Sequence, residues 1–191
     1  MVLASASLAT AAQEQATLPK PGMALVAADQ LQDGNFARTV VLIIQRGYAG
    51  TVGIVLNRPT ASRVVDALPD LPQGLRTGEH YLYRGGPLSP DGISILLGGQ
   101  RAPPGTRRVS IDLAVIASPA GLSALAAQPG PWPTIRYFAG YAGWGPGQLE
   151  AELARGDWHL ARIDAEHALA RDVSTMWHDL IVDFRGRWAL R

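Results

Sequence analysis

The sequence lacks cysteine and almost lacks lysine, and the first absence removes several kinds of chemistry. With no thiol in 191 residues, the chain has no disulfide, no thiolate nucleophile and no sulfur ligand for a metal. Of 17 basic residues only Lys20 is a lysine, and the formal net charge is only +1. The arginines accompany many alanines, glycines and prolines, so we attribute them to compositional bias rather than to nucleic-acid binding.

Long apolar runs are also missing. The best internal run covers residues 39–44, far short of the ~18 residues of a membrane-spanning helix, so we expect no membrane partner. The N-terminal MVLASASLATAAQEQ has an Ala-Thr-Ala tripeptide of the kind signal peptidase cleaves but no basic segment before it. Two alternatives stay open: residues 1–20 are a flexible tail, or residues 1–12 belong to a signal-peptide remnant and the protein is exported.

The length and the pattern of the remaining residues predict one α+β domain over residues 21–191. A chain of this length buries roughly 70% of its unfolded surface. Apolar, β-branched segments predict a strand at 23–28 and a buried hairpin formed by 39–45 and 51–56. Further strands are expected at 81–84, 93–97, 134–138 and 157–163, with a brief pairing at 109–111, and helices at 61–68, 121–127, 148–155 and 174–184. Strands outnumber helices and mostly connect through turns, which favours α+β over regular βαβ alternation.

Three segments in this order resemble the YqgE/AlgH family of bacterial proteins: TVGIVLNRP at 51–59, Gly85-Gly86-Pro87, and GYAGWGPGQLEAE at 140–152 followed by Gly-Asp-Trp. DGNFARTVV at 33–41 and Trp177 are supporting matches. The resemblance implies a strongly bent mixed sheet that closes into a pseudo-barrel with flanking helices, and a cytoplasmic location. It also implies the label of putative transcriptional regulator, with no agreed catalytic residues. The chain departs from the family at residues 44–47 and 97–99, where relatives carry histidine.

The glycine-rich run at 140–147 has two interpretations. As a site, its bare backbone closes on a ligand beside Tyr141 and Trp144, and Gln148 opens a helix whose amides bind an anion. As a purely structural element, the glycines let a strand turn sharply into a helix over packed aromatics, which we favour. Glu150 then lies in the first helical turn, where the helix dipole favours a carboxylate.

Two other segments are candidates for binding. Arg58 follows a strand end, where its guanidinium can grip a carboxylate or phosphate; equally, Asn57 satisfies loop backbone while Arg58 pairs with Asp66 or Asp70. Gly85 and Gly86 form either a turn, which we favour, or the lip of a ligand site.

No familiar catalytic or metal-binding motif is present. The four histidines lack metal spacing, and no GxSxG elbow, P-loop or GxGxxG fingerprint occurs. We therefore expect no cofactor and no metal. Nucleic-acid binding needs a basic face, for which two arginine clusters are available but no helix-turn-helix: Arg101, Arg107 and Arg108, and Arg185, Arg187 and Arg191.

These observations favour a non-enzymatic binding or regulatory module that acts through a small ligand or a protein partner. Its candidate residues are Asn57, Arg58, Gly85, Gly86, Tyr141, Trp144, Gln148 and Glu150. The alternatives are an enzyme that uses Arg58 and Glu150, and a nucleic-acid-binding transcriptional regulator.

Overall fold

A computed structural model describes residues 18–76, 78–100, 104–127 and 134–189, with side chains as far as residue 185. Its first strands are β1 (Met23–Ala27), β2 (Val40–Gly47), β3 (Gly50–Val55), β4 (Pro59–Arg63) and β5 (Tyr81–Arg84). They are followed by β6 (Leu88–Gly98), β7 (Arg107–Arg108), β8 (Leu113–Ile116), β9 (Thr134–Trp144) and β10 (Trp158–Arg162). The helices are α1 (Val64–Ala67), the 3-10 turn η1 (Gln73–Leu75), α2 (Pro119–Ala126), α3 (Gln148–Arg155), α4 (Ala165–Ala168) and α5 (Met176–Ala189).

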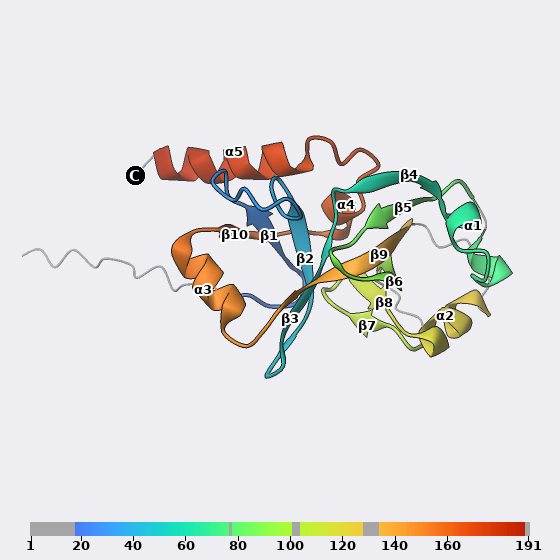
Figure 1. The fold of residues 1–191 in the computed structure, drawn as a ribbon. Helices are drawn as coiled ribbons and strands as arrows, with labels where there is room; N and C mark the ends of the chain where they lie inside the picture. Colours follow the sequence, from blue (N-terminus) through green and yellow to red (C-terminus); the bar gives the residue numbers. More distant parts are fainter. Residues whose placement is uncertain (1–17, 77, 101–103, 128–133, 190–191) are drawn as a thin grey trace, which may run out of the picture.

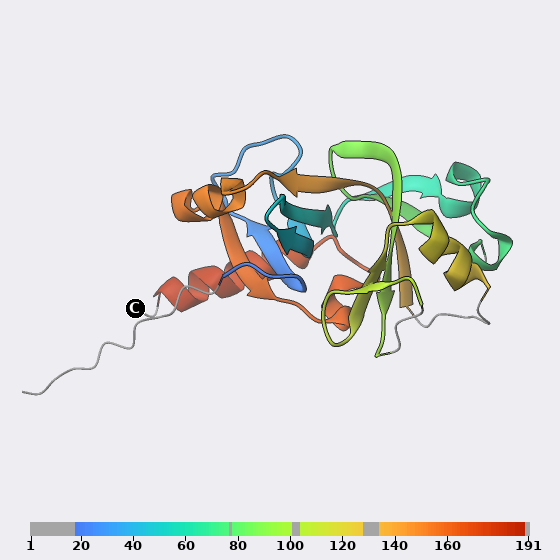
Figure 2. The same ribbon diagram turned by 90° about the horizontal axis from the view of Figure 1, so that it is seen from below.

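The strands form one bent sheet in the order β10-β1-β2-β3-β9-β6-β8-β7, with β5 joining β9 to β4. All pairings are antiparallel except that of β5 with β9, so the sheet is mixed, as expected. Figures 1 and 2 show the sheet curling, with α3 and α5 beside one half and α1 and α2 beside the other. This architecture confirms the predicted α+β class and bent, barrel-like sheet.

Strand β9 holds the two halves together. Its first residues pair with β6 and β5, whereas its last residues, 142–144, pair with β3. Between them lies Gly140, with a φ of 73°, at the point where the backbone of 85–86 crosses β9. The Gly85 amide donates to the Ala139 carbonyl (2.7 Å), and a Cβ on Gly86 would lie 2.1 Å from the Tyr141 carbonyl carbon. Gly86 and Gly140 are required here because the backbone of 85–86 lies directly against that of β9, which leaves no room for a side chain.

The expected sharp bend from strand to helix lies later than we predicted. β9 continues through Trp144, and the chain turns at residues 145–147, where Gly147 has a φ of 75° and α3 begins directly afterwards. Gly140 thus serves the backbone crossing, whereas Gly145 and Gly147 lie in the turn.

Among the described residues, local contacts hold the curl of the sheet, and no ladder joins its edge strands. The Asp112 carboxylate accepts a hydrogen bond from the Ala165 amide (2.8 Å), which joins the β8 side of the sheet to α4. A Cβ on Gly22 would meet the Val109 carbonyl oxygen at 2.4 Å, so the chain entering β1 runs tightly past the loop before β8.

Both faces of the β1–β2 half are covered, which explains why these strands are almost continuously apolar. Ala24 and Val26 face one cluster that includes Phe138 and residues of α5, and Leu25 faces another that includes Trp144 and Trp158. A third cluster lies under α1 and α2.

Two expectations need correction. Residues 59–63 are a strand, β4, and only four residues of the helix expected at 61–68 are helical. The brief pairing falls on β7 and not on 109–111, and neither β8 nor α4 was anticipated. Residues 1–17 of the tail expected at 1–20 lie outside the described residues. Within the described part of the chain, no helix is both long and apolar enough to span a membrane.

Candidate functional site

Trp144 serves the fold. It is buried and packs edge-on against Trp158, with 5.9 Å between ring centres, while Phe36 stacks on it at 6.0 Å. Glu152 Oε2 accepts hydrogen bonds from the indole nitrogens of both tryptophans, each at 2.8 Å. We call Phe36, Trp144, Trp158 and Glu152 the tryptophan clasp; it fastens α3 to strands β9 and β10.

Gln148 and Glu150 lie at the exposed start of α3. The Gln148 side chain caps the turn by accepting from the Gly145 amide (3.1 Å) and donates to Glu152 Oε1 (2.9 Å). Glu150 forms an exposed ion pair with Arg46 (2.9 Å), and this hydrogen bond lowers the pKa of the Glu150 carboxyl. The carboxylate is thus already engaged.

Asn57 and Arg58 fasten the loop in front of β2. Asn57 Oδ1 accepts from the Val40 amide and its Nδ2 donates to the Arg38 carbonyl, both at 2.9 Å, while Arg58 Nη2 donates to the Ala37 carbonyl at 2.6 Å. Arg38 itself has a φ of 56°, a left-handed conformation uncommon outside glycine. Three side-chain hydrogen bonds therefore hold Arg38 in a strained backbone conformation.

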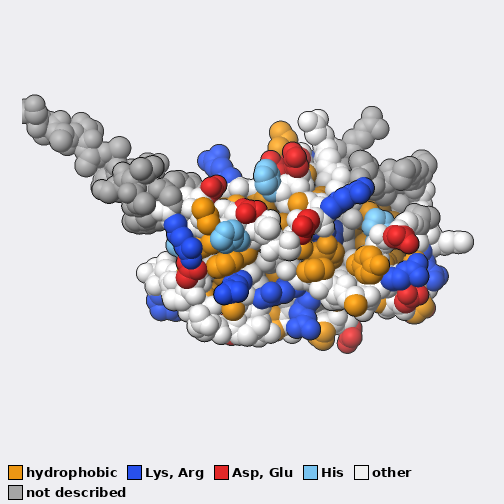
Figure 3. Space-filling model, turned by 90° about the horizontal axis from the view of Figure 1, so that it is seen from above, with side chains coloured by type: hydrophobic (Ala, Val, Ile, Leu, Met, Phe, Trp, Pro, Cys, Tyr) orange, Lys and Arg blue, Asp and Glu red, His pale blue; other side chains and the backbone are white. Residues whose placement is uncertain are grey.

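Above this loop lies a hollow of about 650 Å³, which we call the arginine cavity. Figure 3 shows basic and hydrophobic side chains side by side on the face that carries α5. The Arg38 guanidinium lies 5.7 Å from the Trp177 ring centre, and the Trp177 indole nitrogen donates to the Ala27 carbonyl (2.7 Å). The cavity is lined by Arg38, Asn57, Arg58, Pro59, Tyr83, Arg171, Asp172, Val173, Ser174, Trp177 and His178.

Charge in the arginine cavity is unbalanced. Three arginines face one carboxylate, Asp172, whose pKa is lowered by hydrogen bonds from Ser174, so the lining carries a net +2 with His178 neutral. Among the described residues, neither Arg38 nor Arg171 donates a side-chain hydrogen bond or forms an ion pair. These groups can bind an anion.

A second hollow of about 550 Å³, the Arg136 cavity, adjoins the first through Tyr83 and Arg171, which line both. Its other lining residues are Glu79, His80, Tyr81, Thr134, Ile135, Arg136 and Leu169.

Tyr141 lies elsewhere. It lines a hollow of about 690 Å³ between β2, β3, β6 and β8, together with apolar side chains and the hydroxyl groups of Ser89, Ser94, Thr106 and Ser118. Arg107 is the one charged residue among those that line it. The larger volume of this cavity comes without converging charge, so the arginine cavity is the better candidate site.

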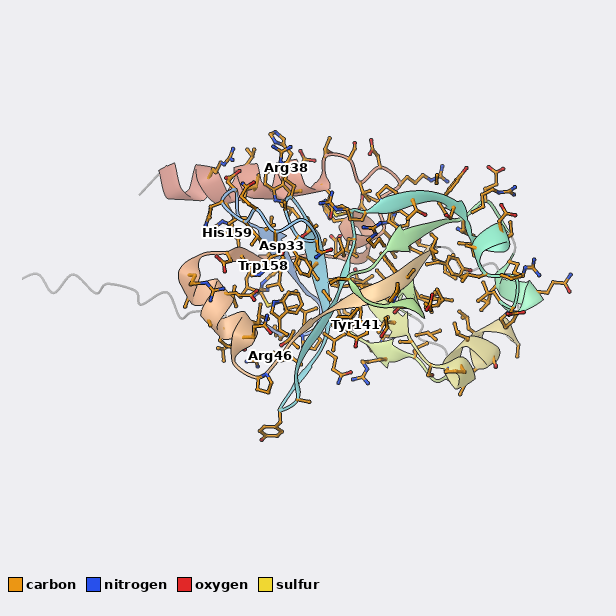
Figure 4. The ribbon with its side chains drawn as sticks, in the orientation of Figure 1. Asp33, Arg38, Arg46, Tyr141, Trp158 and His159 are labelled. Carbon is orange, nitrogen blue, oxygen red and sulfur yellow. The ribbon has the colours of Figure 1, made fainter. Side chains whose placement is uncertain are left out.

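The candidate residues from the sequence therefore do not form one site. Asn57 and Arg58 line the arginine cavity, Gly85 and Gly86 are buried at the backbone crossing, and Tyr141 lines a separate hollow. Arg58 and Glu150 are not brought together: Arg58 contacts the loop before β2, and Glu150 pairs with Arg46 near the other end of that strand, roughly 20 Å along it. Figure 4 shows Arg38 and Arg46 at these two ends.

Sequence reasoning missed Arg38 and Arg171 as site residues and noted Trp177 only as a family match. Arg38 belongs to the quoted DGNFARTVV segment, but nothing in that pattern marks its conformation.

In the two arginine clusters considered for nucleic-acid binding, some of the side chains already bind other groups of the protein. Arg108 donates to the carbonyls of Gln100, Ser110 and Ile111, and Arg185 is paired with Asp29. Arg101 and Arg191, and the side chain of Arg187, lie outside the described residues. In the described part of the chain, no three His, Asp or Glu residues are grouped as a metal site would need.

The fold and these hollows define a small single-domain α+β protein with a curled half-barrel sheet and an arginine-lined candidate binding site. The chain belongs to the AlgH-like family, whose model matches residues 24–189. This confirms the resemblance to the YqgE/AlgH proteins.

Relatives and solved structures agree with the assignment. A UPF0301 protein of Streptomyces coelicolor is 38% identical over 177 residues, which cover 88% of this chain and 89% of the relative. The crystal structure of protein DIP2367 from Corynebacterium diphtheriae is similar with a TM-score of 0.72 and 28% identity, covering 86% of each chain. The solution structure of the AlgH protein from Pseudomonas aeruginosa is similar with a TM-score of 0.66 and 28% identity, covering 87% of this chain and 90% of that one.

Proposed function

We propose that this protein is a non-enzymatic binding module whose ligand is a small anion held in the arginine cavity. The observation that supports the proposal is the convergence of Arg38, Arg58 and Arg171, from three separate segments, on one hollow with a net positive lining. Guanidinium groups bind carboxylates and phosphates through paired hydrogen bonds, which gives both strength and orientation.

The aromatic wall adds a place for an organic part of the ligand. Trp177 is fixed by its hydrogen bond to Ala27, and Tyr83 lies in the same lining. Sites for small molecules typically combine such apolar surfaces with a few placed polar groups. The cytoplasmic location and the regulatory role that the family resemblance implies are part of the same proposal, with the ligand controlling contact with a protein partner.

The experiment is a thermal-shift screen of the full chain against organic carboxylates, phosphates and nucleotides, followed by calorimetry of each compound that stabilises it. A ligand at 100 times its Kd stabilises by about 2.7 kcal/mol, which at this chain length raises Tm by roughly 5–11 °C. We expect Arg38→Ala and Arg171→Ala to weaken binding at least about tenfold.

The matched control is Arg107→Ala, which removes the same charge from β7, outside the arginine cavity. Binding in this variant should equal that of the wild type. The proposal fails when no anion stabilises the protein, or when the anions that do bind are indifferent to Arg38 and Arg171.

A further inference from the structure

Among the described residues, Arg136 is the buried cation. It lies on β9 with 7% of its surface exposed, and its Nη1 donates to the Ala168 carbonyl at 3.2 Å while Nη2 donates to the Ala170 carbonyl. Its guanidinium carbon is 4.4 Å from the centre of the Tyr83 ring. Among the described residues it has no carboxylate partner, and burial lowers the pKa of Arg136. A buried charge without an opposite charge is costly unless something supplies one.

The position of Arg136 connects the two neighbouring cavities. The carbonyls that it holds belong to Ala168 and Ala170, so it fixes the chain just before Arg171. Arg171 and Tyr83 line both the arginine cavity and the Arg136 cavity. Arg38, Arg58 and Arg171 thus line the first cavity, and Arg171 and Arg136 line the second.

We propose that the two cavities form one elongated site for a short linear polyphosphate, either free or as the tail of a nucleotide. This inference rests on the proposed function of the arginine cavity and extends it. Four arginines face two carboxylates, Asp172 and Glu79, which leaves a net +2 along the site. A polyphosphate carries charge on every unit and matches cations spaced along a path, whereas a dicarboxylate has charge only at its ends and leaves Arg171 unmatched.

The experiment compares orthophosphate, pyrophosphate, tripolyphosphate, ATP and glutarate by calorimetry on the full chain at constant ionic strength. We expect tripolyphosphate to bind at least about tenfold more tightly than orthophosphate, because occupying the first cavity raises the effective concentration at the second. Arg38→Ala should weaken the binding of both orthophosphate and tripolyphosphate. Arg107→Ala, the control for net charge, should leave both affinities unchanged.

Two variants address the Arg136 cavity. Arg136→Gln should abolish the tighter binding of tripolyphosphate relative to orthophosphate. Because replacing a buried arginine can also destabilise the fold, Glu79→Gln provides an independent measurement: it removes the carboxylate of that cavity, so tripolyphosphate should bind at least about twofold more tightly while orthophosphate is unchanged.

The outcomes separate this inference from the proposed function. Equal affinity for orthophosphate and tripolyphosphate, or Arg38-dependent binding of glutarate alone, overturns the elongated site but leaves the arginine cavity as a binding site. Binding of no anion in an Arg38-dependent way overturns both. Tighter binding of ATP than of tripolyphosphate supports the nucleotide as the source, and equal or weaker binding supports free polyphosphate.

Discussion

Replacing Glu152 with alanine should destabilise the protein far more than replacing any exposed glutamate. The change removes the oxygen that accepts hydrogen bonds from Trp144 and Trp158, whose side chains are only 4% and 3% exposed. A buried donor left without an acceptor costs about 1–3 kcal/mol, so two indole groups together give about 2–6 kcal/mol. At this chain length the loss lowers Tm by roughly 4–24 °C.

The assay is urea unfolding followed by circular dichroism, with Glu150→Ala as the matched control. Glu150 lies two residues away on the same helix, but its ion pair with Arg46 is exposed, so its loss should cost at most about 1 kcal/mol. Glu152→Gln keeps one acceptor oxygen and should fall between the two. The reasoning is refuted when Glu152→Ala and Glu150→Ala lose the same small amount of stability.

Two further predictions concern the backbone crossing and a buried phenol. Gly140→Ala should unfold at a clearly lower urea concentration than Gly147→Ala. Both glycines have φ near 75°, a conformation that costs alanine about 1–2 kcal/mol, but only at Gly140 would the Cβ also meet a carbonyl oxygen, that of Gly86 at 2.6 Å. Equal losses of stability in the two variants would contradict the tight crossing. The Tyr137 hydroxyl donates to the Leu75 carbonyl (2.6 Å), and burial raises the pKa of Tyr137 to about 12. The neutral phenol therefore contributes its full stabilisation below its unfolded pKa of about 10, and this stabilisation is lost as the pH rises towards 12. Ultraviolet titration should show one of the five tyrosines ionising late, and Tyr137→Phe should remove that phase; unchanged late ionisation in the variant would assign it to another residue.

The elements that the sequence predicted well are those whose residue pattern has one interpretation. The β-branched hairpin of β2 and β3 and the helix α3, flanked by glycines, are of this kind, and both are confirmed. Residues 61–63 belong to the helix predicted at 61–68, because Val64, Val65 and Leu68 share a helical face, but β4 covers 59–63. Pairing with β5 instead makes them a strand, and this long-range contact leaves no local signal.

The same limit applies to the candidate site. Arg58 was singled out because it follows a strand end, yet its guanidinium holds the neighbouring loop while Arg38, which that loop carries, faces the cavity. Arg38, Tyr83 and Arg171 meet only because distant segments fold together, so no spacing rule connects them. The glycines were correctly associated with backbone constraint, but their crossing partner, 85–86 against 140–141, required the structure.

The role of β9 has a consequence for synthesis of the chain. Because β3 and β6 are neighbours of β9 and not of each other, the pairings that join the two halves of the sheet cannot form before residues 134–144 have left the ribosome. Until then the nascent protein carries strands whose edges await a partner, and unpaired edges are prone to association with other chains. The interval before residues 134–144 emerge is therefore the one in which this chain is most prone to such association.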